Sequence, residues 1–197
     1  MAASLQHLLG YLEYIFAAKS KHGVHAPFAY EFVTQVLNQN NLHPDFEQIE
    51  RLRSEMLNSS AFLEIEDHGA SLKDGYQKKL ADVVRNAAKK SKYAKLLYRI
   101  IAYYRPQICV ELGTNVGLSS LYQALALSED AYLHTIEGSK ALADIAQFNI
   151  EKLNLQHKVQ VHHATFDDRY PAILKHVQRL DYVFIDGNHQ EEATLRY

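Results

Sequence analysis

From Pro106 onward, short apolar runs alternate with longer amphipathic segments, and this alternation most constrains the fold. The apolar runs are typical of strands, and they are residues 107–112, 131–137, 158–164 and 180–186. The segments between them have the length and pattern of helices, and they are residues 119–127, 140–153 and 170–178. Strands separated by helices of this length pair in parallel through right-handed crossovers. The pattern therefore predicts a doubly wound parallel α/β sheet, covered by helices on both faces.

The residues before this alternation are patterned mainly as helices. The predicted helices are residues 5–16, 29–37, 46–57, 76–88 and 93–104. Residues 61–69, with the sequence AFLEIEDHG, fit either a short strand or a turn. We expect two regions, a helical cap or oligomerisation region over residues 1–92 and a ligand-binding α/β domain over residues 93–197.

Composition excludes several classes of partner. The chain is 47% hydrophobic and 22% charged, with a net charge of −2, so it lacks the basic field that binds nucleic acid. No run approaches the roughly 18 apolar residues that a membrane span needs. Cys109 is the single cysteine, which rules out an intramolecular disulfide. We expect a cytoplasmic protein that binds neither nucleic acid nor membranes.

The stretch VELGTNVGLSS joins the first of these strands to its helix. In doubly wound sheets, ligands bind beyond the carboxyl ends of the strands, which is where Gly113 and Gly117 lie. Glycines there let a ligand approach the backbone closely. A dinucleotide loop needs G-x-G-x-x-G, but Asn115 and Leu118 stand where the second and third glycines belong. A nicotinamide-dependent oxidoreductase is therefore disfavoured.

Two carboxylates at strand ends indicate the chemistry of the ligand. Glu111, just before the glycine loop, would repel a pyrophosphate and attract a cation. Glu137 ends the next strand, where an acidic residue accepts hydrogen bonds from both hydroxyls of a ribose. An adenosine that carries a cationic amino acid is S-adenosylmethionine.

Three stretches carry a family resemblance, and they are VELGTNVGLSS, TIEGSKALADIAQFNIEKLNL and LDYVFIDGNH. They resemble the first, second and fourth strand motifs of class I S-adenosylmethionine-dependent methyltransferases, especially the small-molecule O-methyltransferases. The resemblance covers about residues 93–195. At the front, KHGVHAPFAYEFV and KYAKLLYRIIAYYRP are similar to a bacterial group within class I. The resemblance implies a Rossmann-like methyltransferase fold, a bound S-adenosylmethionine and a small-molecule methyl acceptor.

The resemblance also implies where the amino-acid end of the cofactor binds. By position, this end is held by Glu111 and by the backbone of Gly113 and Asn115, with Gly117 in the same loop and Ser119 close by. Asn115 stands where many members have a glycine, and its backbone N–H is retained.

The adenosine and sulfonium ends are assigned in the same way. The resemblance implies that Glu137 takes the ribose hydroxyls, that Gly138 lies under the adenine and that Thr165 or Phe166 flanks the ring. Asp186 would reach the sulfonium side.

Two residues are candidates for catalysis, Asp186 and His189. Either would remove the proton of the acceptor, and the unperturbed pKa of a histidine lies near neutrality. In metal-assisted members the acid equivalent to Asp186 binds a divalent ion, but further oxygen ligands come from later strands. His162 and His163 have no third ligand at zinc spacing, so we expect no metal site.

The class I sheet normally continues with three more strands. The sequence ends one short helix after the fourth strand, as expected of either a fragment or a naturally incomplete domain. We expect the apolar edge at residues 181–185 to pair in a homo-oligomer or to be capped by the N-terminal helices. The alternative to an enzyme is a catalytically silent module that binds S-adenosylmethionine or a partner.

Overall fold

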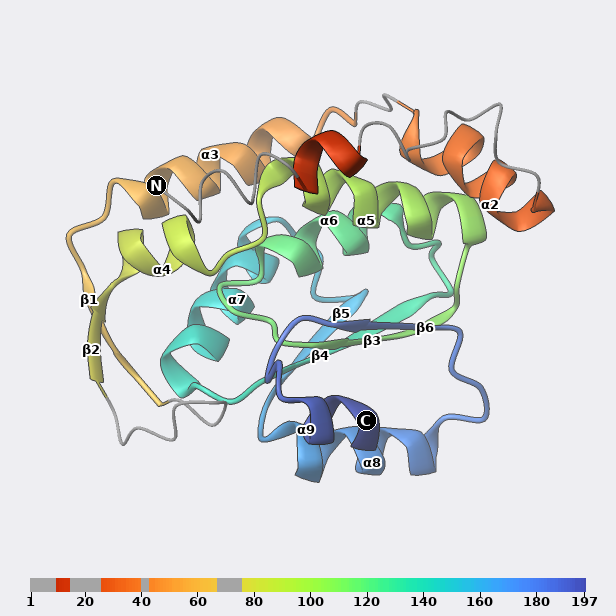
Figure 1. Cartoon of the computed structure of the whole chain (residues 1–197). Helices are drawn as coiled ribbons and strands as arrows, with labels where there is room; N and C mark the ends of the chain where they lie inside the picture. Colours follow the sequence, from red (N-terminus) through yellow and green to blue (C-terminus); the bar gives the residue numbers. More distant parts are fainter. Residues whose placement is uncertain (1–9, 15–25, 40–42, 67–75) are drawn as a thin grey trace. The chain divides into compact units, whose positions relative to one another are not determined.

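The computed structural model describes residues 10–14, 26–39, 43–66 and 76–197 (Figure 1). The chain divides into two compact units, residues 1–40 and residues 41–197. The functional boundary expected between residues 92 and 93 remains a prediction.

The first unit is helical where it is described. Residues 10–14 form a helical segment, and the rest of the helix predicted at 5–16 lies outside the described residues. Helix α2 spans Pro27–Glu31 and continues as a π-helix, η2, over Phe32–Leu37. These two elements correspond to the helix predicted at residues 29–37.

The second unit contains the sheets and the remaining helices. Its strands are β1 (Phe62–Ile65), β2 (Tyr76–Lys79), β3 (Ile108–Leu112), β4 (Tyr132–Glu137), β5 (Val159–His163) and β6 (Tyr182–Ile185). Its helices are α3 (Phe46–Leu57), α4 (Leu80–Asn86), α5 (Ser91–Tyr104), α6 (Leu118–Ala126), α7 (Lys140–Lys152), α8 (Phe166–His176) and α9 (Glu191–Arg196). Among the described residues, no helix combines the length and hydrophobicity needed to cross a membrane.

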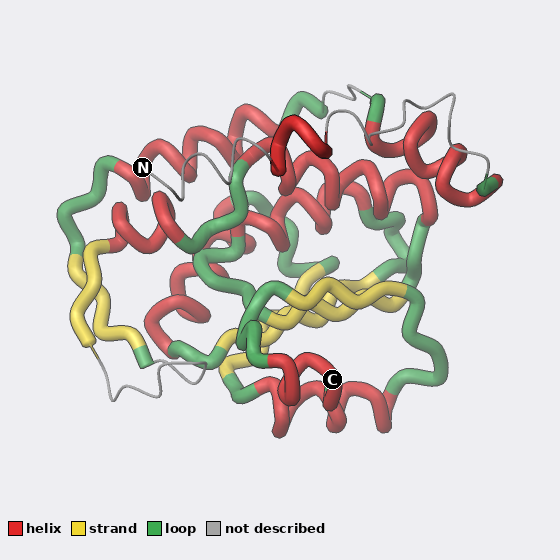
Figure 2. Tube along the Cα trace, viewed as in Figure 1, coloured by secondary structure: helices red, strands yellow, loops and turns green. Residues whose placement is uncertain are grey.

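The main sheet confirms the predicted parallel architecture. Its strand order is β5-β4-β3-β6, and every neighbouring pair is parallel. Figure 2 shows the strands in yellow and the helices in red. The chain moves outward from β3 through β4 to β5 and then returns past β3 to form β6. The direction of winding therefore switches between β3 and β6.

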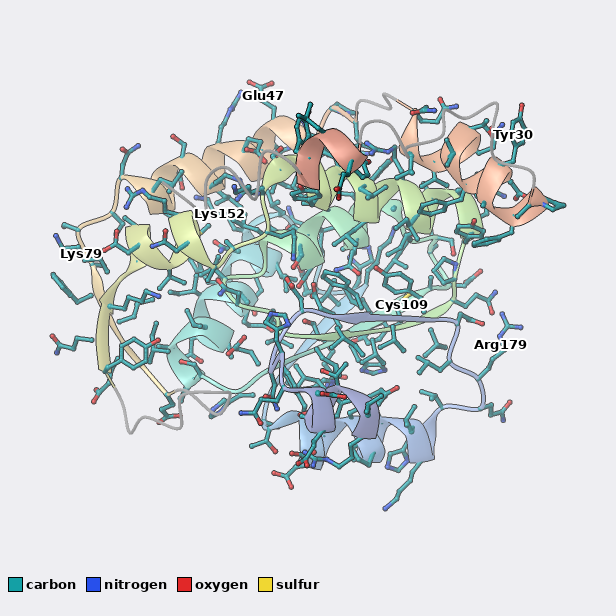
Figure 3. The ribbon with its side chains drawn as sticks, viewed as in Figure 1. Tyr30, Glu47, Lys79, Cys109, Lys152 and Arg179 are labelled. Carbon is teal, nitrogen blue, oxygen red and sulfur yellow. The ribbon has the colours of Figure 1, made fainter. Side chains whose placement is uncertain are left out.

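This switch places helices on both faces of the sheet. Helices α6 and α7 lie on one face and α8 on the other (Figure 1). Cys109 and Leu133 pack in the larger core with α6, whereas Val110 and Ile136 pack in a second core with Tyr170 of α8. Cys109 is fully buried on the sheet, as expected of a small core side chain, while Arg179 projects at the surface (Figure 3). The fold is thus a three-layer Rossmann-like sandwich.

The segment predicted as a helix over residues 76–88 begins instead as a strand. Tyr76–Lys79 pairs antiparallel with Phe62–Ile65, so residues 62–65 of the ambiguous stretch form strand β1, and residues 67–69 of that stretch lie outside the described residues. The pairing gives residues 76–79 hydrogen-bond partners across the sheet, and the N–H of Leu80 extends it by donating to the Ala61 carbonyl at 2.9 Å. The helix therefore begins only at Leu80.

Helix α8 begins at Phe166, four residues before the predicted start at Tyr170. Thr165 is the N-cap, and its hydroxyl accepts a hydrogen bond from the Asp168 N–H at 3.2 Å. Asp167 and Asp168 occupy the first turn, where acidic side chains favour the helix dipole. The start of the helix is therefore fixed by capping rather than by apolar periodicity.

Candidate functional site

A cavity of about 600 Å³ lies at the carboxyl ends of β3, β4 and β6. This is the switch point of the sheet, where open α/β sheets bind ligands. Its other wall comes from the β1–β2 hairpin and from the connection between α4 and α5, with Tyr76, Lys78 and Lys89 among the residues that line it. The cavity therefore lies between the edge of the sheet and residues that precede the sheet in sequence.

Most of the site residues expected from the sequence line this cavity. They are Gly113, Asn115, Ser119, Glu137, Gly138, Thr165, Phe166, Asp186 and His189. Glu111 and Gly117 are not among the lining residues.

Gly113 is required where the loop passes the end of β6. Its φ of +108° lies in the region that side chains rarely adopt. A Cβ atom there would lie 2.8 Å from the backbone oxygen of Asp186 and 2.9 Å from its carbonyl carbon. The backbones that follow β3 and β6 therefore touch directly, and this contact brings Asp186 to the cavity.

Gly117 and Asn115 shape the rest of the loop. Gly117, with a φ of +82°, lets the start of α6 pack on Ala146 of α7, where a Cβ would lie 3.1 Å from the Ala146 Cα. Asn115 has a left-handed backbone with a φ of +52°. Its side-chain oxygen accepts from the Val116 N–H at 2.8 Å, and its own N–H donates to Glu137 at 2.8 Å. The loop is thus held from within, and the Asn115 N–H already has a partner.

Glu137 is fixed at the tip of β4 by backbone donors. Its Oε2 accepts from the Asn115 N–H at 2.8 Å, and its Oε1 accepts from the Ser139 N–H at 3.0 Å. Burial raises the pKa of this carboxyl, and the hydrogen bonds from Ser139 and Asn115 oppose that rise. Each carboxylate oxygen keeps a further lone pair that can face the cavity.

Glu111 lies behind the loop and is fully buried. Its Oε2 accepts from the hydroxyls of Ser120 and, at 2.7 Å, Thr135, and its Oε1 accepts from the Gln123 amide at 2.8 Å. Burial raises the pKa of Glu111, and these hydrogen bonds oppose the rise. The carboxylate therefore ties α6 to β4 underneath the glycine loop.

The polar residues of α6 are the sequence pattern from which the position of Glu111 behind the loop could have been predicted. Ser119, Ser120 and Gln123 are all buried in a helix that is otherwise apolar. Buried polar side chains need hydrogen-bond partners, and a strand-end carboxylate on the same face of the sheet supplies them.

An aromatic wall closes the side of the cavity next to α8. Phe166 packs against the turn after β6, since a Cβ at Gly187 would lie 2.8 Å from the Phe166 ring. The rings of Phe166 and Tyr197 meet edge to face, with centroids 5.7 Å apart. Thr165 lines the same side. This wall offers flat apolar surface to a planar group.

Asp186 forms an ion pair with Lys89, which lies between α4 and α5. The Nζ of Lys89 donates to Asp186 Oδ1 at 2.7 Å, and both residues line the cavity. The Lys89 ammonium also lies 5.4 Å from the centroid of the Phe184 ring. His189 lines the cavity near the same end of β6.

Lys89, Asn188 and Tyr197 are cavity residues that sequence reasoning missed. Asn188 donates to the Tyr197 hydroxyl at 3.0 Å, and its Oδ1 is buried with no hydrogen-bond partner among the described residues. Asn188 stands beside His189 in the DGNH stretch, so proximity to that motif was an available signal. Lys89 had none, because its partner lies 97 positions away in sequence.

His134 and His162 form a stacked pair on the sheet, away from the cavity. Arg169 donates from Nε to His162 Nδ1 at 3.1 Å, so that nitrogen carries no proton. His162 Nε2 then donates to His134 Nδ1, 3.0 Å away. Among the described residues, no three His, Cys, Asp or Glu side chains gather as metal ligands.

This histidine pair predicts a pH-dependent stability. Burial and the nearby Arg169 lower the pKa of His162 to about 4, from a usual value near 6.5. The unfolded chain therefore binds more protons than the folded chain below pH 6.5, and stability falls as the pH drops toward 4. We expect His162 to cost about 3 kcal/mol of unfolding free energy between pH 7 and pH 4, measured by urea denaturation.

A variant comparison isolates that effect. In His162→Asn the amide oxygen can still accept from Arg169 but does not titrate, so the loss of stability at low pH should shrink by about that amount. His157→Asn, at an exposed position, should leave the pH dependence unchanged. Parallel pH profiles for the wild type and His162→Asn would contradict the assignment.

Comparison with known proteins gives one family match and several relatives. Residues 110–197 match the family described as Methyltransferase domain. A catechol O-methyltransferase from Mus musculus is 33% identical over 94 residues, which are 47% of this chain and 36% of that protein. One from Sus scrofa is 33% identical over 97 residues, 48% of this chain and 52% of that protein. The matches thus span about a third to a half of these relatives.

Solved structures agree on the fold. An O-methyltransferase from Bacillus cereus, in complex with S-adenosylhomocysteine, superposes with a TM-score of 0.55 and 22% identity, covering 84% of this chain and 63% of that one. An O-methyltransferase-like protein from Klebsiella pneumoniae superposes with a TM-score of 0.52 and 15% identity, covering 82% of this chain and 61% of that one. At these identities the likeness is one of fold.

Proposed function

We propose that this protein binds S-adenosylmethionine and transfers its methyl group to the oxygen of a small-molecule acceptor. The match of residues 110–197 to the methyltransferase domain family and the likeness in fold to a solved O-methyltransferase support this proposal. The observation that carries the proposal is Glu137. It is an acid at the tip of β4 that backbone donors hold in place on the cavity wall. A carboxylate oriented before the ligand arrives can accept both hydroxyls of a ribose without losing side-chain freedom.

The remaining cavity residues fit the rest of the cofactor. Gly138 and the Phe166 side of the cavity suit the adenine, with Thr165 at the same wall. Ser119 suits the amino-acid end, for which the missing side chain of Gly113 leaves space. Asp186 would lie toward the sulfonium, where a carboxylate is complementary to the positive charge.

We assign Gly113 and Glu111 supporting roles. The N–H of Gly113 already donates to the Ile136 carbonyl at 3.0 Å, so its contribution is the space that its missing side chain leaves. Glu111 would act from behind the loop through Thr135 and Ser120, rather than through direct contact with the cofactor.

The protein's part in the reaction is placement of the acceptor and exclusion of water. S-adenosylmethionine, when bound, supplies an electrophilic methyl group. His189 and Asp186 lie on the turn after β6, where either would take the proton of an acceptor hydroxyl. The acceptor oxygen would then be held in line with the methyl group.

Glu137→Ala tests the ribose assignment. Hydrogen bonds to a charged group contribute about 1.5–3 kcal/mol each, so the loss of two should weaken binding of S-adenosylhomocysteine by at least about 100-fold in isothermal titration calorimetry. Asp144→Asn is the matched control, since it removes an exposed carboxylate of α7 that pairs with Lys140 at the surface. If Glu137→Ala binds within twofold of the wild type, the assignment is wrong.

A silent binding module is the alternative to an enzyme. Both would bind S-adenosylmethionine, but only the enzyme would release S-adenosylhomocysteine when it is incubated with a panel of phenols and amines. Release with phenols and not with amines would favour an oxygen acceptor.

We further propose that the protein is a cytoplasmic homo-oligomer. The single Cys109 is a buried free thiol, which suits a reducing compartment. Strand β6 pairs only with β3 among the described strands, and Val183 and Ile185 on it are each 36% exposed. A second copy pairing there would cover an apolar edge. Sedimentation at the mass of a monomer would contradict this.

A further inference from the structure

Lys89 places an ammonium group at the cavity, and the proposed methyl transfer gives this group no role so far. Lys89 lies in the short connection between α4 and α5, outside the region that matches the methyltransferase family. Its side chain is 26% exposed, and that of its partner Asp186 is 20% exposed. The pair is therefore partly shielded from solvent, where charge interactions are stronger than at an open surface.

Two contacts fix the position of this ammonium. Asp186 Oδ1 accepts one of its N–H groups at 2.7 Å, and the face of Phe184 lies 5.4 Å from the nitrogen. Both partners come from the end of β6, the strand that carries the proposed catalytic side chains. An ammonium has three N–H donors, so Lys89 retains donors for a ligand in the cavity.

The charge of the pair decides what kind of acceptor suits it. Asp186 alone would repel an oxygen that is losing its proton, whereas the Lys89–Asp186 pair is neutral overall and presents a donor. A neighbouring cation lowers the pKa of an acidic hydroxyl by about 1–3 units. The same cation would repel a protonated amine. The pair therefore favours an oxygen acceptor that reacts as an anion.

We propose that Lys89 binds the acceptor oxygen and selects acceptors with an acidic hydroxyl, such as phenols, by stabilising their anionic form. This inference rests on the proposed function and adds its substrate class. The proton leaves the hydroxyl to His189 or solvent, and the oxygen lone pair then forms the new bond to the methyl carbon as the carbon–sulfur bond breaks.

Other charged and titratable groups share the cavity and bear on any pH measurement. They are Glu66 and Lys78 at the hairpin, Glu137 at the tip of β4, Asp167 in α8, His189 after β6, and the phenols of Tyr76 and Tyr197. Asp167 is paired with Arg196 at 3.0 Å. A comparison between variants at Lys89 keeps all of these groups constant.

The test uses 4-nitrophenol, whose absorbance reports its own ionisation. The probe is titrated with acid on protein saturated with S-adenosylhomocysteine, for the wild type and for Lys89→Met. We expect the bound probe to remain anionic on the wild type to a pH at least about one unit lower than on Lys89→Met. Lys89→Arg, which keeps the charge, should restore most of the shift. Lys90→Met, at the adjacent exposed lysine, should behave as the wild type.

The outcomes separate this inference from the proposed function. Calorimetry with S-adenosylhomocysteine comes first, and failure of the wild type to bind it overturns the proposed function. If S-adenosylhomocysteine binds but the probe does not, or if the probe ionises alike on the wild type and Lys89→Met, only the role of Lys89 is overturned. If Lys89→Met fails to fold, Lys89→Gln replaces it. A probe that ionises on the wild type at the same pH as it does free in solution is also sufficient to reject the role of Lys89.

Discussion

Gly113→Ala should abolish binding of S-adenosylhomocysteine and destabilise the fold by about 3 kcal/mol or more. The new methyl group would lie 2.8 Å from the Asp186 oxygen, and that oxygen belongs to the backbone, which cannot rotate away. The residue would also keep a φ near +108°, which is strained for alanine. To relieve the clash, the end of β6 would have to move away from β3, and the cavity wall from Asp186 to His189 would move with it.

Urea denaturation and calorimetry measure the two effects separately. Gly10→Ala is the control for the added methyl group, because Gly10 is helical and a Cβ there meets nothing within 4 Å. That variant should be neutral or more stable by up to about 1 kcal/mol. Gly113→Ala with normal stability and normal affinity would show that β3 and β6 do not touch as described.

Glu111→Ala should lower the free energy of unfolding by about 3–5 kcal/mol. Removal of the carboxylate leaves the Ser120 and Thr135 hydroxyls and the Gln123 amide buried without their acceptor, and it leaves an unfilled space. Burial raises the pKa of Glu111, and the free-energy cost of burying its charge offsets part of the stabilisation that its hydrogen bonds give the wild type. That cost does not offset the loss of the acceptor of Ser120 and Gln123, whereas the Thr135 hydroxyl keeps Thr114 as a hydrogen-bond partner at 2.6 Å.

Glu111→Gln is the informative companion variant. The Gln123 Oε1 is buried without a hydrogen-bond partner among the described residues, so it can accept from a new amide after the Gln123 side chain flips. The charge and its desolvation cost disappear together. We therefore expect a loss of only about 1 kcal/mol in urea denaturation. Equal losses for Glu111→Ala and Glu111→Gln would mean that the charge, and not the hydrogen bonding, stabilises the loop.

The parallel sheet was predictable because period and length distinguish its strands from its helices. The four apolar runs and the helices between them all appear near their expected places. The position of Glu137 on the cavity wall followed from the same logic, since parallel strands end at one edge. Hydrophobic pattern and chain order were sufficient for both.

The remaining features depend on contacts between residues that are distant in sequence. Residues 76–79 became a strand because β1 pairs with them. Lys89 entered the cavity because Asp186 and Phe184 attract its ammonium. Glu111 was expected at the ligand, yet its carboxylate points to α6, because alternation along β3 places it on the same face as Cys109. Each of these features depends on a contact with a residue that lies far away in the sequence, so the neighbouring residues alone could not predict it.

The return of the chain to place β6 beside β3 has a kinetic consequence. Strands β3, β4 and β5 follow one another and can assemble from nearby segments, whereas β6 must wait for a long loop to close. The rim bearing Asp186 and His189 would then be completed late, after the folding barrier. A ligand bound in the cavity would therefore slow unfolding and leave the folding rate nearly unchanged.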